Sequence, residues 1–222
     1  MNIDLTNYWI FAILAVFAVI PALVASARLP KLNSDFDPFV IAIWLKGLNA
    51  VFGYIIEHFG YNNVVHYNIW YLLDAFVLLW AFRKWNLIES KKLYKYLVFA
   101  FGIFWLVETI FFSELSGDYN SYFRIISIFA VILMSIGMIN ILLLKATVNP
   151  LKNSIFQICC TLIILHTITV ISEAFFAYNL ILGNEFRIYM DHIITFIDAL
   201  CSLIFALIIL WLPRKQAFTL QY

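Results

Sequence analysis

Charged residues are scarce in this sequence: only 12% of its 222 residues are Asp, Glu, Lys or Arg, while 64% are hydrophobic. A soluble domain is usually about one quarter charged and about half apolar, so a water-soluble fold is excluded. The net charge is only +1, and the basic residues are spread along the chain without forming one patch, so we expect no nucleic-acid partner. The expected environment is a lipid bilayer.

Cysteine is rare as well, with Cys159, Cys160 and Cys201 all inside apolar runs. A structural disulfide is not expected there, and three cysteines cannot all pair within one chain. We predict that they are packing residues.

Familiar catalytic and cofactor motifs are missing too. The chain has no H-x-x-x-H metal motif, no G-x-S-x-G, no P-loop, no Rossmann fingerprint and no haem-attachment motif. The last apolar run, 189–212, contains no lysine that could hold a retinal Schiff base. We therefore expect no cofactor and no metal, and an enzyme is the less favoured class.

Seven long apolar runs fill most of the chain. A hydrocarbon core about 30 Å thick needs roughly 20 apolar residues per helix, which these runs supply. The sequence predicts an all-α protein, a single seven-helix transmembrane domain over residues 1–222, with the third span short and the sixth long. The predicted spans are Tyr8–Ala27, Pro38–Glu57, Tyr67–Phe82, Tyr96–Ser113, Tyr122–Leu144, Ser154–Tyr178 and Tyr189–Leu212.

Lys and Arg concentrate in every second loop, on one side of these spans, which predicts the orientation. Basic residues in short loops stay cytoplasmic. After the odd-numbered spans come Arg28, Lys31, Arg83, Lys84, Lys91, Lys92, Lys95, Lys145, Lys152, Arg214 and Lys215, whereas the opposite side has only Arg124 and Arg187. The N-terminus is therefore predicted outside and the C-terminus in the cytoplasm.

The first span has a second interpretation, a cleaved signal peptide, because Ala25-Ser26-Ala27 fits a cleavage site. Asp4 and the lack of a basic residue before the apolar run oppose it. As a membrane helix, this span carries small residues that favour close helix packing, with a kink expected at Pro21. Its stripe consists of Ala12, Ala15, Ala18, Ala22 and Ala25.

Polar side chains recur at helical spacing in five of the predicted spans. Five polar stripes cannot all face lipid, so they are expected to converge on one interior. At about 1.5 Å per residue they form two layers. Lys46, Asp74, His166 and Asp198 fall near mid-depth, and Glu57, Glu108 and Glu173 fall nearer the outer end. The pattern predicts an outward-facing acidic cavity with a lysine at its floor.

Simpler interpretations of these residues stay open. Lys46 could only neutralise Asp74 or Asp198, and His166 could be a satisfied core residue. The outer glutamates could line a non-specific wet vestibule. Their positions, each followed by a Tyr-Asn pair, also suggest a threefold repeat of helix pairs.

The favoured function is a transporter or channel-like protein that binds a cation or small ligand in this cavity. The alternative is a receptor-like sensor whose cytoplasmic partner binds the basic loop at Arg83, Lys84, Lys91, Lys92 and Lys95. A third is an intramembrane enzyme that acts on a lipid through a carboxylate pair and His166. The abundance of Phe, Ile and Asn suggests a bacterial inner membrane.

Overall fold

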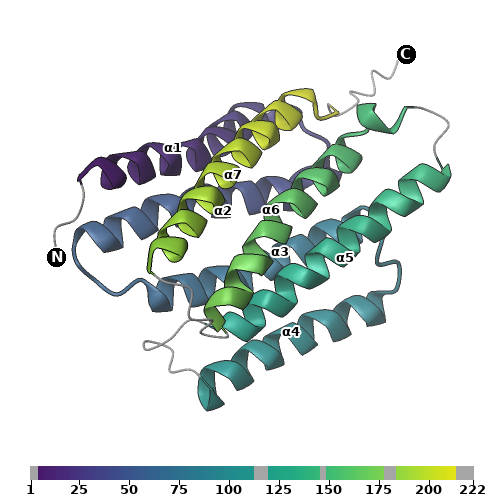
Figure 1. The fold of residues 1–222 in the computed structure, drawn as a ribbon. Helices are drawn as coiled ribbons and strands as arrows, with labels where there is room; N and C mark the ends of the chain where they lie inside the picture. Colours follow the sequence, from purple (N-terminus) through teal and green to yellow (C-terminus); the bar gives the residue numbers. More distant parts are fainter. Residues whose placement is uncertain (1–4, 113–119, 146–148, 178–183, 214–222) are drawn as a thin grey trace.

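The computed structural model describes residues 5–112, 120–145, 149–177 and 184–213, and within these ranges every long element is an α-helix (Figure 1). The all-α prediction is confirmed. The helices are α1 (Leu5–Arg28), α2 (Asp37–His58), α3 (Val64–Lys84), α4 (Lys91–Phe111), α5 (Ser121–Lys145), α6 (Ser154–Ala177) and α7 (Asn184–Trp211). The third predicted span is not short, because α3 continues for 21 residues through Val64 and Lys84.

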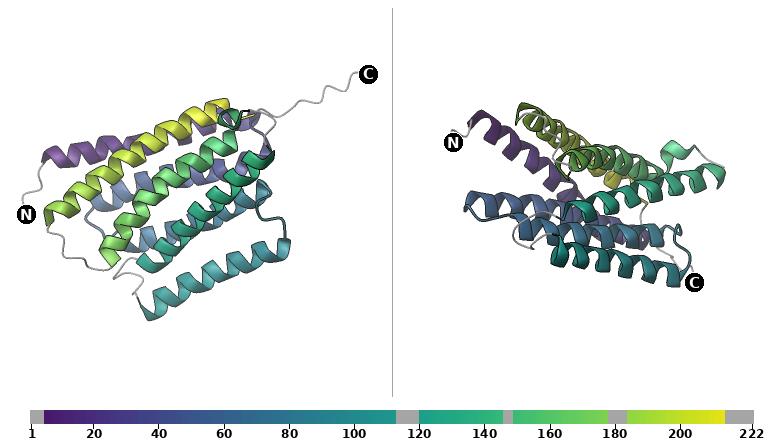
Figure 2. Two further views of the ribbon diagram at one scale, coloured as in Figure 1. Left: turned by 45° about the vertical axis from the view of Figure 1, so that its right-hand side comes forward. Right: turned by 60° about the horizontal axis from the view of Figure 1, so that its bottom comes forward.

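The helices form an up-down bundle in which chain neighbours pack side by side (Figures 1 and 2). The ring closes because α7 returns to pack against α1, while α3 also packs against α5. Helix α4 lies at the edge of the bundle, against α3 and α5. We call the end at which α1, α3, α5 and α7 finish the basic end, since Lys31, Lys84, Lys91 and Lys152 lie there.

Six helices, α2 to α7, are long and apolar enough to cross a membrane. Helix α1 is described with its side chains only from Val16 onward. The outward surface is apolar as well: the side chains of Phe99 and Leu207, for example, are 68% and 49% exposed. Large exposed apolar surface is unfavourable in water and favourable in lipid. The chain is therefore an integral membrane protein.

Small residues set the distance between α1 and α2. A Cβ added to Gly47 would lie 3.0 Å from the Cβ of Ala22 and 3.4 Å from the carbonyl oxygen of Ala18, and Ala25 is fully buried. Close approach of this kind depends on side chains no larger than a methyl group. The packing role predicted for the alanine stripe is confirmed for these alanines; the side chains of Ala12 and Ala15 lie outside the described residues.

Arg28 joins the end of α1 to the end of α7. Its guanidinium donates to the carbonyl oxygen of Ile209 at 2.7 Å and also to that of Leu210. The last carbonyl groups of a helix have no partner within the helix, and a cation there is favourable. The backbone N–H of Asn33 donates to the carbonyl oxygen of Pro213 at 3.2 Å, so the basic end is closed on this side.

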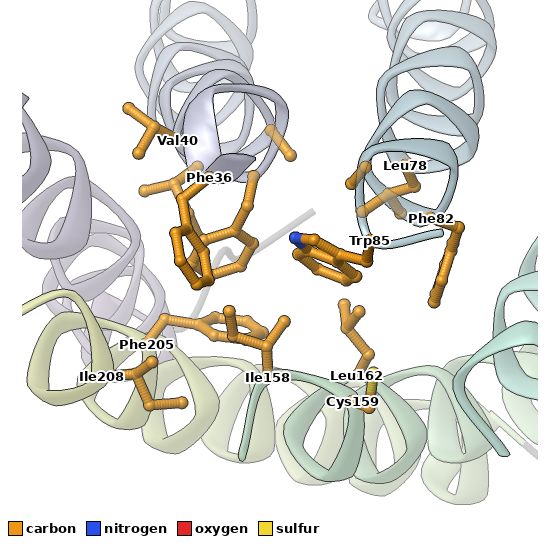
Figure 3. Packing of buried hydrophobic residues seen from close by; sticks show 14 of the residues in the cluster. Phe36, Val40, Leu78, Phe82, Trp85, Ile158, Cys159, Leu162, Phe205 and Ile208 are labelled. Atoms are coloured by element: carbon orange, nitrogen blue, oxygen red, sulfur yellow. The ribbon is translucent and has the colours of Figure 1, made fainter. Parts of the chain in front are cut away.

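Buried apolar side chains gather in the half of the bundle nearest the basic end, and Figure 3 shows how some of them pack. Phe39 packs edge-on against Phe205, with ring centroids 5.5 Å apart, and Phe82 packs edge-on against Trp85 at the same distance. Ile158 from α6 is fully buried among them. Edge-on contacts of this kind are favoured arrangements of aromatic rings.

The close α1–α2 contact leads to the first prediction. Gly47→Val should lower the free energy of unfolding by about 1–3 kcal/mol, because the added side chain overpacks a backbone contact. Gly102→Val is the matched control, since the nearest atom to a Cβ there is Phe76 Cζ at 3.7 Å. Thermal unfolding in detergent should show a much larger loss for Gly47→Val. Equal losses for the two variants would contradict this account of the contact.

Candidate functional site

Four ionisable residues lie at one level, halfway along their helices. Asp74 is the central residue of α3, and Lys46, His166 and Asp198 lie within about two residues of the midpoints of α2, α6 and α7. In an up-down bundle of helices of similar length, these midpoints coincide in depth. The four residues also line one cavity, so the structure brings the predicted middle layer together.

This cavity has a volume of about 180 Å³ and lies between α2, α3, α5, α6 and α7. Its residues recur three, four or seven positions apart along each helix, so each helix turns one face toward it. The polar lining consists of Lys46, Asn49, Trp70, Tyr71, Asp74, Arg124, His166, Thr169 and Asp198. The apolar lining consists of Phe39, Ala42, Ile43, Leu45, Leu78, Ile128, Leu162, Leu165 and Phe205.

Lys46 on α2 and Asp198 on α7 form an ion pair between the two helices that flank α1. The distance from Lys46 Nζ to Asp198 Oδ1 is 2.6 Å, and the two side chains are 22% and 36% exposed. Of the two partners considered for Lys46 from the sequence, the structure therefore selects Asp198. Removal of either partner from this partly buried pair leaves a charge without its counter-charge, which is destabilising.

Asp74 has no such partner. No hydrogen bond or ion pair joins its carboxylate to any residue that the structure describes, although the charge of Lys46 acts on it. Lys46, Asp198 and Asp74 together carry a formal charge of −1 when all are ionised. An unpaired carboxylate at mid-depth in a membrane is costly, so it is balanced by a cation or a proton.

Three further polar atoms of the lining residues lack a hydrogen-bond partner in the described structure, namely His166 Nε2, Asn49 Oδ1 and Arg124 Nε. All three atoms are buried. Buried polar atoms are nearly always hydrogen-bonded, and exceptions mark functional sites or bound molecules. This arrangement does not fit His166 as a fully satisfied core residue.

Arg124 and Glu173 form a second ion pair, nearer the opposite end. The distance from Arg124 Nη1 to Glu173 Oε1 is 2.5 Å, and the guanidinium lies 4.0 Å from the ring centroid of Tyr71. Glu173 lies seven residues beyond His166 on α6, which is about 10 Å toward the opposite end. The charge of Glu173 is therefore balanced inside the protein.

Glu108 binds the first turn of α5. Its carboxylate accepts the backbone N–H groups of Tyr122 at 2.9 Å and Phe123 at 2.5 Å. A carboxylate at a helix N-terminus satisfies donors that have no partner within the helix and interacts favourably with the helix dipole. Glu108 does not line the cavity. The side chain of Glu57 lies outside the described residues.

A buried amide pair holds α3, α4 and α5 together beside this cap. Asn68 Oδ1 accepts the backbone N–H of Asn120 at 3.0 Å, and Asn120 Nδ2 donates to Thr109 Oγ1 at 2.7 Å. Trp105 Nε1 donates to the carbonyl oxygen of Asn68 at 3.0 Å. These bonds explain how α4, whose single buried residue in the described structure is Glu108, is attached to the bundle.

The sequence did not assign Arg124 to the site, although it lines the cavity. In the sequence pattern, Arg124 is one of the two basic residues on the outer side of the spans. Its position inside the predicted span Tyr122–Leu144 was the available signal, since a charge inside a span is a functional candidate in its own right.

Within the described parts of the chain, no three His, Cys, Asp or Glu side chains gather closely enough to hold a metal ion. Comparisons with protein-family models, with curated proteins and with solved structures found no match. The functional argument therefore starts from the cavity.

The Lys46–Asp198 pair leads to the second prediction. Lys46→Met and Asp198→Asn should each lower the unfolding temperature, and the double variant should lose less than the sum of the two. We expect a coupling of about 0.5–3 kcal/mol, because the two side chains are in direct contact. Denaturation of the four proteins in one detergent measures it. Strictly additive losses would contradict an energetically important pair.

Proposed function

We propose that this protein is a transporter-like membrane protein with seven spans that binds a small ligand or cation in the cavity between α2, α3, α5, α6 and α7. The observation that supports this most strongly is the unpaired Asp74 carboxylate at mid-depth, beside an ion pair that already uses Lys46. Intramembrane ionisable groups that face a cavity typically mark substrate or ion pathways.

The cavity is proposed to open toward the end opposite the basic end. The apolar core with Phe39 and Phe205 lies between the four mid-depth residues and the basic end. The polar lining continues from these four residues toward the opposite end, through Asn49, Tyr71 and Arg124. With one side closed by a dense core, the arrangement fits the outward-facing state of a transporter and does not fit an open channel.

The proposed orientation keeps the N-terminus outside and the C-terminus in the cytoplasm. Lys31, Lys84, Lys91 and Lys152 lie at the basic end, as the positive-inside tendency requires of a cytoplasmic face. Arg124, an exception in the sequence pattern, supports the same orientation, because its charge is balanced by Glu173 inside the bundle. The membrane predicted from composition is a bacterial inner membrane.

In the proposed mechanism, Asp74 holds the cationic group, and the charge of Lys46 acts on the Asp74 carboxylate as an internal counter-ion when no cation is bound. Asp198 keeps Lys46 within the cavity when Asp74 is occupied, and His166 at the same level can accept or pass on a proton. Glu57 stays a predicted contributor at the outer end. Glu173 acts through Arg124, and Glu108 acts through the stability of α5.

A receptor-like sensor is the second candidate. The observation that favours it is the basic surface at the start of α4, where Lys84, Lys91, Lys92 and Lys95 are exposed and Arg83 lies over the ring of Tyr94. In this proposal a cytoplasmic partner binds that surface, and ligand binding in the cavity shifts the helices that carry it.

Charge movement in proteoliposomes leads to the third prediction. When cations, protons, amines and amino acids are applied in turn to protein on a solid-supported membrane, at least one should produce a transient current. Asp74→Asn should abolish this current, because the cation then lacks its counter-charge. Asp35→Asn makes the same chemical change at an exposed position near the basic end and should leave the current intact.

Glu108→Gln tests whether Glu108 only stabilises the fold or also belongs to the path that the ligand takes through the protein. We expect a lower unfolding temperature and an unchanged current per folded protein. Currents that persist in Asp74→Asn would rule out this cavity as the path. Ligand-dependent stabilisation without any current would identify the sensor instead.

A further inference from the structure

We propose that the ligand of this cavity is a small primary amine with an apolar body, such as an alkylammonium or arylalkylammonium ion. This inference rests on the proposed ligand-binding function and names its substrate class. It depends on three independent properties of the cavity, namely its charge, its unpaired acceptors and its apolar floor.

The charge favours a monocation. Lys46 is paired with Asp198, and Arg124 is paired with Glu173, so Asp74 is left as the unbalanced group of the lining. One positive charge on the ligand makes the cavity neutral. A carboxylate ligand would instead add a second unbalanced negative charge at mid-depth, where charge is most costly.

The unpaired atoms favour a group that donates several hydrogen bonds. The Asp74 carboxylate and Asn49 Oδ1 are acceptors, and His166 Nε2 accepts when it carries no proton. A primary ammonium has three N–H donors and no acceptor, so it can donate to the Asp74 carboxylate and offers the kind of group that Asn49 Oδ1 and a neutral His166 Nε2 lack. A quaternary ammonium has the same charge but no N–H and would leave them unpaired.

The floor of the cavity favours an organic body over a bare inorganic ion. Phe39, Leu78, Leu162 and Phe205 lie directly below the charged layer and offer no oxygen ligand. A metal cation would lose its water there without a full set of oxygens to replace it. A cavity of about 150 Å³ holds one benzene molecule, so the roughly 180 Å³ available here suit a ring with a short amine arm.

Thermal unfolding of the purified full-length protein with a matched set of probes tests this assignment. The probes are benzylamine, benzyl alcohol, benzoate, benzyltrimethylammonium and the chlorides of sodium and potassium. Each of the other probes resembles benzylamine either in its aromatic ring or in its single positive charge. We expect benzylamine alone to raise the unfolding temperature in a concentration-dependent manner. Loss of a charge-assisted hydrogen bond in Asp74→Asn should weaken benzylamine binding at least about tenfold, whereas Asp35→Asn should bind normally.

A second variant covers the case in which Asp74→Asn does not fold. Leu162→Trp keeps every charge but fills the floor, so it should lose benzylamine while still binding methylamine. Benzylamine binding that is unchanged in both variants would overturn the proposed site.

The remaining outcomes separate the ligand class from the function. A different probe could stabilise the protein in place of benzylamine, namely benzoate, benzyl alcohol or an inorganic cation. If Leu162→Trp or Asp74→Asn removes that stabilisation, the amine assignment is overturned, but the cavity is still a ligand-binding site. Equal stabilisation by benzyltrimethylammonium would show that charge alone selects the ligand and would overturn the role of the N–H donors. Failure of every probe would count against both proposals.

Discussion

The structure depends on the balance of charge at the middle of the bundle. A membrane interior does not compensate charge as water does, so Lys46 of α2 and Asp198 of α7 are held together, 2.6 Å apart. Their contact joins α2 to α7, and α1 packs against both helices, with Ala18 and Ala22 of α1 next to Gly47 of α2. Asp74 lies at the same level, lines the same cavity and is not included in this pair.

The bundle is divided along its length into two halves with different chemistry. Toward the basic end, aromatic side chains such as Phe82 and Trp85 fill the interior. Toward the opposite end, polar residues line the space, and the charges of Arg124 and Glu173 cancel each other. Under the proposed function, the dense core on one side and the polar cavity on the other would give access from one face only, as in an outward-facing transporter or a sensor.

Much of the fold followed from the sequence, because hydrophobic runs of membrane length and helical spacing are local properties. The same spacing predicted that Lys46, Asp74, His166 and Asp198 share one level. Pairing was not predictable, since it depends on the distances between helices. A sequence could not show that Lys46 selects Asp198, that Arg124 turns inward to Glu173, or that Glu108 serves the N-terminus of α5. Each of these contacts joins residues on different helices.

The most direct test of a cavity open to one face is thiol labelling in membrane vesicles, with Cys159, Cys160 and Cys201 replaced by alanine. Thr169→Cys lines the cavity, and Ile158→Cys lies in the apolar core of the same helix. The account predicts that a charged, membrane-impermeant thiol reagent modifies Thr169→Cys from the outside only and Ile158→Cys from neither side. Labelling of Thr169→Cys from the cytoplasmic side, or from neither side, would contradict it.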